Sequence, residues 1–155
     1  PETLPPSASP RMKPNRFSWT FTIGRESIDA NGHVNNVEYV RWMQEVAIRH
    51  TQHVGADVRA VAAGLTWVAR SHEIEYRVPA FEDDEIEVCT WIDSVQRVSS
   101  IRRYEFRRTR DDILLASGQT NWVCFNRDSE RPVAIPERLV QMYFEANDSP
   151  DSDAP

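Results

Sequence analysis

Hydrophobic and polar residues alternate along most of this chain. In its first part Phe17, Trp19 and Phe21 alternate with Ser18 and Thr20, and a period of two predicts a half-buried strand. Turn-forming residues separate the later stretches from one another. Strands are therefore predicted in residues 16–28, 66–78, 85–95, 98–110 and 113–126. The second of these places Val68, Ile74, Tyr76 and Val78 on one face and Glu73, Glu75 and Arg77 on the other.

One long stretch breaks the alternation. Asn35 can cap a helix, and Glu38, three residues later, completes an N-x-x-E capping box. Eight of the twelve residues in 37–48 are apolar, more than a single buried stripe needs. The pattern predicts a helix from Asn36 to about His53, ending before Gly55 and covered on most sides. A short final helix is expected from Glu137 to about Glu145.

The order of these elements limits the fold. One strand, one long helix and four further strands exclude a doubly wound parallel sheet. They favour a single α+β domain, residues 15–146, in which an antiparallel sheet wraps around one central helix. Residues 1–14 hold five prolines and predict a disordered leader. Residues 147–155 hold three aspartates and two prolines and predict a disordered acidic tail.

Composition excludes several classes of protein. A net charge of −6 argues against a nucleic-acid binder. No apolar run is long enough to span a bilayer, and the first residues lack the pattern of a signal peptide. The chain has two cysteines, Cys89 and Cys124, which are expected to be free and buried. A reducing compartment, and so a cytosolic location, is therefore expected.

Neither a metal nor a cofactor is expected. The chain has only five glycines and no Gly-rich phosphate loop. No G-x-S-x-G signature of a serine hydrolase is present either. His50, His53 and Asp57 would suit a metal by spacing, but histidines that pack or face solvent are the favoured interpretation.

The segment between the first strand and the long helix carries the candidate chemistry. Asp29 is expected at a strand end, and a helix begins at Asn36, seven residues later. Thioester hydrolysis needs a base or nucleophile and a donor for the oxyanion, which a free N–H at a helix N-terminus supplies. The alternative is that Asp29 only accepts local N–H bonds in a turn.

The sequence IDANGHVNNVEYVRWMQE, residues 28–45, resembles the hotdog-fold thioesterases of the 4-hydroxybenzoyl-CoA thioesterase type. Its D-x-N-x-H-V-N-N core is similar to plant acyl-ACP thioesterases. The resemblance implies a hotdog fold with Asp29 as catalytic carboxylate and the Asn36 N–H as the group that polarises the carbonyl. It also implies that Asn31 and His33 assist the aspartate, although His33 would equally suit a role in orienting the loop.

The segment also departs from the plant pattern. The plant enzymes carry a further glutamate shortly after an E-Y-R segment, whereas here 75–77 is followed by Val78-Pro79-Ala80. A simpler site with a single aspartate is therefore expected. Glu45 is a reserve candidate, because another branch of these enzymes keeps its catalytic glutamate on the helix.

Further residues are candidates for substrate binding. Six arginines fall on one predicted hairpin: Arg97, Arg102, Arg103, Arg107, Arg108 and Arg110. They either solvate a sheet edge or contact coenzyme A phosphates, for which Arg102 and Arg103 are the candidates. Gly32 in the loop and the aromatic residues Tyr39 and Trp67 are expected to contact the rest of the substrate.

The expected activity is hydrolysis of acyl-CoA to free acid and coenzyme A. An acyl-ACP thioesterase and a non-catalytic acyl-CoA binding module on the same fold are the alternatives. A homodimer or homotetramer is expected, because in enzymes of this type two protomers join their sheets. The sequence leaves open the acyl group and whether Asp29 acts as nucleophile or as general base.

Overall fold

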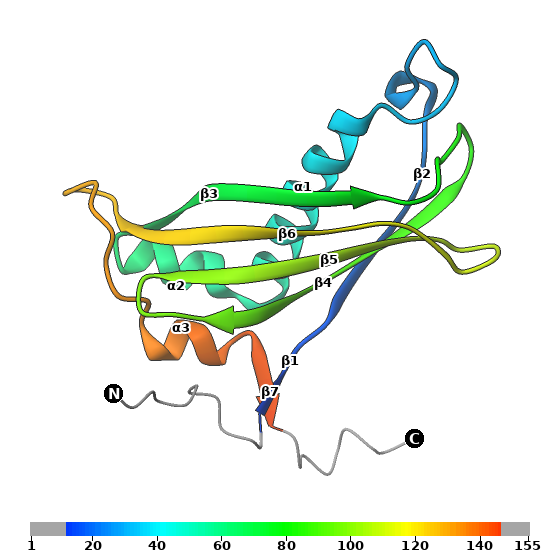
Figure 1. Cartoon of the computed structure of the whole chain (residues 1–155). Coiled ribbons are helices and arrows are strands. Elements are labelled where there is room, and N and C mark those ends of the chain that lie inside the picture. The colour runs from blue at the N-terminus through cyan, green and yellow to red at the C-terminus, as the bar shows by residue number, and fades with distance from the viewer. Residues whose placement is uncertain (1–11, 147–155) are drawn as a thin grey trace, which may run out of the picture.

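The computed structural model describes residues 12–146, so most of the predicted leader and the acidic tail lie outside the described residues. The end of the predicted leader is an exception. Strand β1 (Met12–Pro14) pairs antiparallel with β7 (Phe144–Ala146), which joins the two ends of the described chain (Figure 1).

A five-stranded antiparallel sheet forms the body of the molecule. Its strands follow the spatial order β2-β4-β5-β6-β3, with helix α1 (Asn36–Val54) across one face (Figure 1). This is the predicted α+β hotdog architecture. The strands are β2 (Phe17–Thr22), β3 (Leu65–Tyr76), β4 (Glu85–Val95), β5 (Ser99–Arg108) and β6 (Ile113–Asn126).

The ends of α1 follow the predicted signals, with one difference. The Asn35 side chain accepts a bond from the Val37 N–H at 3.0 Å, and Gly55 ends the helix with a φ of 81°. Glu38 does not complete a capping box. Its carboxylate accepts instead from the Ser27 hydroxyl at 3.0 Å and from Arg41.

The described residues form two apolar clusters. The first packs Tyr39, Met43 and Val46 of α1 against buried residues that include Ile86 and Phe106. The second lies beyond the other end of α1. It uses α2 (Ala56–Ala62), which the sequence analysis did not predict, and α3 (Glu137–Gln141), which is shorter than predicted.

Two details of the strands differ from the prediction. β2 ends at Thr22, and a 3-10 turn at Arg25–Ser27 separates it from Asp29. β3 carries a bulge between Ala69 and Ser71. The bulge reverses the alternation, so Val68 is exposed while Ile74 packs on the core.

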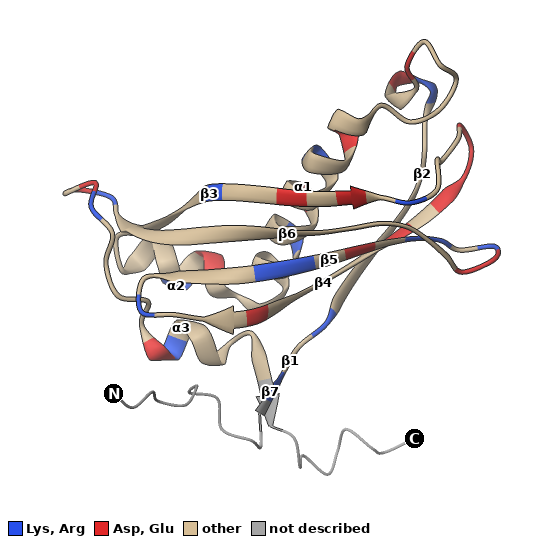
Figure 2. Ribbon diagram, in the orientation of Figure 1, with Lys and Arg blue, Asp and Glu red and all other residues tan. Residues whose placement is uncertain are grey.

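The predicted hairpin of arginines is not at a sheet edge, because β5 is the central strand. Positions along it alternate in burial, so Arg102 and Arg108 are buried, whereas Arg103 is exposed. Positive and negative residues are interspersed over the strands rather than gathered in one basic strip (Figure 2). Within residues 12–146 no helix is both long and apolar enough to cross a membrane.

Candidate active site

The loop that carries Asp29 is a tight turn closed by its own backbone. Ile28 and Val34 form an isolated antiparallel bridge. The Asp29 N–H donates to the His33 carbonyl at 3.0 Å, and the Gly32 N–H donates to the Asp29 carbonyl at 3.0 Å. Gly32 has a φ of 89°, and nothing lies within 4 Å of the position a Cβ would take. Glycine is therefore needed there for its backbone conformation.

The Asp29 carboxylate is half-buried and only partly engaged. Its Oδ1 accepts the Asn31 N–H at 2.8 Å, while the described residues donate no hydrogen bond to Oδ2. One oxygen therefore fixes the carboxylate in the turn and the other remains free for water or substrate. Asp29 therefore acts as a turn residue through Oδ1, as the alternative interpretation predicts. Its Oδ2 remains available for a chemical role.

The start of α1 offers a free donor beside this loop. Asn35 uses its side-chain oxygen for the Val37 N–H and its carbonyl for the Glu38 N–H. The Asn36 N–H has no acceptor within the described residues, and Asn36 is exposed. The positive end of a 19-residue helix lies at this point. An oxyanion can therefore bind there.

A second loop, residues 79–84, holds the Asp29 loop in place. The Val34 N–H donates to the Ala80 carbonyl at 2.9 Å, and the His33 ring meets the Phe81 ring edge-on with centroids 6.1 Å apart. The Asp84 carboxylate accepts the Phe81 N–H at 2.9 Å.

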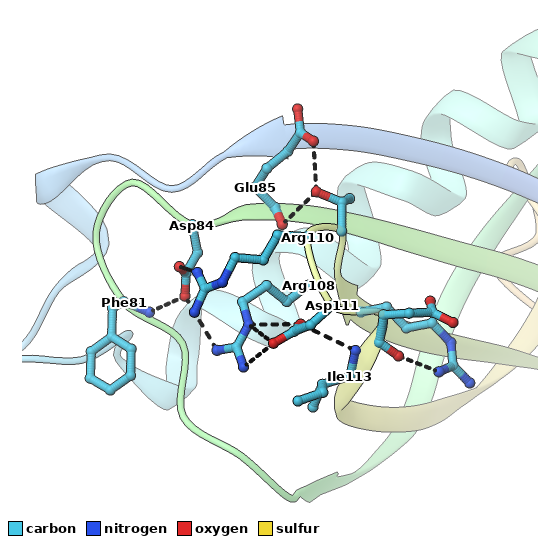
Figure 3. Close-up of polar contacts among 10 residues, drawn as sticks. Phe81, Asp84, Glu85, Arg108, Arg110, Asp111 and Ile113 are labelled. Carbon is cyan, nitrogen blue, oxygen red and sulfur yellow. Dashed lines mark hydrogen bonds and ion pairs between the residues drawn. The ribbon is translucent and has the colours of Figure 1, made fainter.

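Asp84 in turn is tied to the β5–β6 hairpin (Figure 3). It accepts from Arg110 at 3.0 Å and lies 3.8 Å from Arg108, which also pairs with Asp111. Asp84 is not among the site residues predicted from the sequence. Asp84 is only 8% exposed, and its arginine partners lie on a hairpin distant in sequence. Residue spacing alone therefore gave no signal.

Exposed apolar side chains surround the helix start. Val37, directly after Asn36, is 66% exposed. Tyr76 is also exposed and donates its hydroxyl proton to the Asn36 carbonyl at 3.1 Å. With Phe81, these side chains form an apolar rim at the site that a substrate or a partner subunit can cover.

The structure divides the predicted site residues into two groups. Asn31, Gly32, His33 and Asn36 lie in or directly beside the Asp29 turn. Tyr39 is buried one turn into α1, and burial raises the pKa of its hydroxyl to about 12.

The other candidates lie elsewhere. Trp67 belongs to the second apolar cluster. Arg102 contacts His50, about 20 Å along α1 from Asn36. Arg103 is exposed and pairs with Asp93 at 3.0 Å. The reserve candidate Glu45 pairs with Arg49 at 2.9 Å.

The favoured interpretation of the histidines, packing rather than metal binding, fits His50. It is buried among aromatic rings, and its Nδ1 accepts from Arg102. Within residues 12–146 no three His, Cys, Asp or Glu side chains are grouped to hold a metal ion.

Comparison with known proteins finds relatives over most of this chain. Acyl-CoA thioester hydrolase YbgC of Escherichia coli is 26% identical over 133 residues, which cover 85% of this chain and 98% of YbgC. Oleoyl-acyl carrier protein thioesterase 2 of Arabidopsis thaliana is 29% identical over 144 residues, which cover 86% of this chain. The match covers only 39% of that plant protein.

Solved structures share the architecture at lower sequence identity. The probable thioesterase YbaW of Escherichia coli has a TM-score of 0.76 and 18% identity, covering 81% of this chain and 94% of YbaW. A 4-hydroxybenzoyl-CoA thioesterase mutant, solved with 4-hydroxybenzoyl-CoA, has a TM-score of 0.75 and 19% identity, covering 83% and 98%. Residues 24–142 match the family model of the thioesterase-like superfamily. The chain therefore belongs to the thioesterase-like superfamily.

Proposed function

We propose that this protein hydrolyses acyl-CoA thioesters to a free acid and coenzyme A, with Asp29 as the working carboxylate. The observation that carries the proposal is that Asp29 keeps one free carboxylate oxygen while the Asn36 N–H, seven residues on at the start of α1, has no acceptor among the described residues. Similarity to YbgC over nearly its whole length supports acyl-CoA as the substrate class.

Each group has a defined task in this reaction. The thioester carbonyl oxygen accepts the Asn36 N–H, which stabilises the negative charge that develops on it. Asp29 either takes a proton from the attacking water or attacks the carbonyl carbon itself. The carbon–sulfur bond then breaks, and coenzyme A leaves as a thiolate that takes up a proton.

A single turnover in ¹⁸O-labelled water tests for a nucleophilic Asp29. If Asp29 is a general base, the labelled oxygen enters the first acid released, and the same label results when water opens an Asp29 anhydride at the acyl carbonyl. If Asp29 is the nucleophile and water opens the resulting anhydride at the Asp29 carbonyl, the first acid is unlabelled and the label remains on the protein.

The test of the proposal is thiol release from a panel of acyl-CoA substrates. Asp29→Asn keeps an acceptor for the Asn31 N–H but removes the base or nucleophile. It should lower kcat by about two orders of magnitude or more. Asp83→Asn is the matched control, because Asp83 is exposed with a φ of 73°, a conformation that asparagine tolerates. Turnover near that of the unsubstituted protein in Asp29→Asn would refute the role of Asp29.

Hydrolysis of acyl-ACP is the second candidate, favoured by the 29% identity to the plant enzyme. Carrier proteins are acidic and need a basic docking face. Four of the six hairpin arginines instead pair with carboxylates of this chain: Arg103, Arg107, Arg108 and Arg110. A higher kcat/KM for the same acyl group on a carrier protein than on coenzyme A would favour this reading.

A non-catalytic acyl-CoA binding module is the third candidate. It predicts saturable acyl-CoA binding without thiol release. Asp29 argues against it, because a carboxylate facing the carbonyl is unfavourable for binding alone. Cys89 and Cys124 are both free, as predicted, but only Cys124 is buried, whereas Cys89 is half-buried. Free thiols support the proposed cytosolic location.

A further inference from the structure

A cavity of about 330 Å³ lies at the other end of α1 from the Asp29 turn. The second half of α1, the sheet and the segment from α3 to β7 surround it. A volume of this size is at the lower end of the range for small-molecule sites. Its walls are mostly apolar and include Ile48, Trp67, Ile92, Val95, Leu139 and Phe144.

One charged side chain is buried in this wall. Arg102 is 3% exposed. Its Nη1 donates to the His50 Nδ1 at 2.9 Å and to the Thr90 hydroxyl at 3.1 Å, and its Cζ lies 5.6 Å from the centre of the Tyr143 ring. None of these partners is an anion. Within residues 12–146 no carboxylate comes within ion-pair distance of Arg102, and Asp57, which also lines the cavity, forms no ion pair with it.

A buried guanidinium without an anion is unfavourable, because it loses its hydration and gains no counter-charge. Burial lowers the pKa of Arg102, yet an arginine side chain keeps its charge in proteins. His50 cannot compensate, since its imidazole is neutral. The contacts with His50 and Thr90 satisfy the Nη1 donor of Arg102. Its Nε and Nη2 donors have no partners among the described residues.

A second donor in the wall is also unsatisfied. The indole N–H of Trp122, which lines the cavity, is buried without a hydrogen-bond partner. Burial raises the pKa of the Tyr104 hydroxyl, and the Trp122 N–H opposes this rise only weakly without reaching hydrogen-bond geometry. The cavity therefore combines an apolar body with donors that lack an acceptor.

We propose that this cavity binds a carboxylate with an apolar body, with the carboxylate on Arg102 and the hydrocarbon among the apolar walls. Guanidinium and carboxylate match each other in bidentate geometry. Two sources supply this chemistry. One is a free fatty acid. The other is the far carboxylate of a dicarboxylic acyl chain whose thioester lies at Asp29, about 20 Å along α1, and this source alone depends on the proposed function.

The first experiment measures binding without catalysis. Decanoate and decanol are titrated into the full-length protein, and fluorescence is followed because Trp67 and Trp122 line the cavity. Decanoate should bind at least about tenfold more tightly than decanol, because only decanoate pairs with Arg102. This comparison uses the unsubstituted protein and is independent of how any variant folds.

Arg102→Met tests the anchor. It should weaken decanoate binding by at least about tenfold and leave decanol binding unchanged. Arg102→Lys keeps the positive charge but loses the bidentate guanidinium, so it should weaken decanoate binding by less than Arg102→Met does. Arg127→Met, at an exposed position outside the cavity, is the matched control and should bind decanoate normally. Decanoate should raise the Tm of the unsubstituted protein and not that of Arg102→Met.

The second experiment distinguishes the sources. Acyl-CoA substrates with and without a terminal carboxylate are compared in the unsubstituted protein and in Arg102→Met. If Arg102→Met raises KM only for the carboxylate-bearing substrate, the cavity binds the far end of the acyl chain. Decanoate binding that needs Arg102, without this effect, assigns it to a free acid. Equal affinity for decanoate and decanol, together with no preference for the carboxylate-bearing substrate, overturns the proposal.

Discussion

At the scale of single residues, the motif predicts which residues gather around Asp29, but the contacts among them differ from those that residue types suggest. Asn31 holds Asp29 through its backbone N–H and not through its side chain. His33 accepts the Asp29 N–H through its carbonyl, and its ring packs against Phe81. Side-chain identity predicts which residues gather at a site. It does not predict backbone contacts, which depend on the turn.

Arg102 shows a second limit at this scale. Neighbouring arginines in an alternating strand face opposite sides, and the sequence alone does not say which side is covered. The expectation of a sheet edge placed Arg102 in solvent. The central position of β5, under α1, instead buries it against His50.

His50 should make stability depend on pH. Burial, then the charge of Arg102 and then His53 lower the pKa of His50 from 6.5 to about 3. In the unfolded chain His50 therefore takes up a proton near pH 6.5, whereas in the folded chain it does so only near pH 3. This contribution to stability is complete above pH 6.5 and is lost as the pH falls toward 3. Between pH 7.5 and 5.5 the free energy of unfolding should fall by about 1 kcal/mol because of His50.

Urea unfolding at pH 7.5, 6.5 and 5.5 measures this loss. His50→Gln, which keeps a neutral acceptor for Arg102, should flatten the fall. His53→Gln is the control at an exposed position and should keep it. The same slope in His50→Gln as in the unsubstituted protein would assign the pH dependence to other groups.

At the scale of elements, the residues next to its ends predicted α1 well. Features that depend on how strands pair left no signal in the sequence. The Asn35 cap and Gly55 lie in the sequence next to the ends they determine. α2 follows Gly55 directly and has no side-chain cap, so the glycine that ends one helix gave no signal that another begins. The β3 bulge arises from its pairing with β6, and the pattern of one strand does not contain it.

A close fit between helix and sheet at Gly118 predicts a sensitive position. A Cβ on Gly118 in β6 would lie 2.9 Å from the Glu73 carbonyl oxygen of β3 and 3.3 Å from the Met43 sulfur of α1. Backbone cannot yield as a flexible side chain can. Gly118→Ala should therefore lower the free energy of unfolding by about 1–3 kcal/mol.

Urea unfolding tests this fit as well. Ser117→Ala, at the next position on the opposite face of β6, is the matched control and should change stability by no more than about 0.5 kcal/mol. Equal stability of Gly118→Ala and the unsubstituted protein would mean that α1 can move away from the sheet at little cost.

At the scale of the whole molecule, the fold class and the family were predictable because one motif and the order of elements pointed to the same answer. The pairing of β1 with β7 was not predictable. It joins residues at opposite ends of the described chain, and the prolines near Met12 favoured a disordered leader. Short strands that pair over such a distance leave no periodic pattern.

Assembly is the remaining prediction, and the sheet suggests how it occurs. The strand order leaves β2 and β3 at the two edges. β3 has 12 residues and β2 has 6, and β3 carries the exposed Val68 and Tyr76. A long exposed edge strand is a template for pairing with another chain. Since Tyr76 bonds to Asn36, a second protomer along β3 would lie beside the candidate active site.

Two measurements test this arrangement, and the chain supplies its own control. Light scattering should give at least twice the monomer mass of 17.9 kDa at the concentrations used for activity. In hydrogen exchange, β3 should be protected on both sides, by β6 and by the partner, whereas β2 pairs only with β4 and should exchange faster. Dilution that dissociates the dimer should speed exchange in β3 and leave β2 unchanged, because only β3 loses a partner. An active monomer would show that the site is complete in one chain, and β3 exchanging as fast as β2 would show that no second protomer pairs along β3.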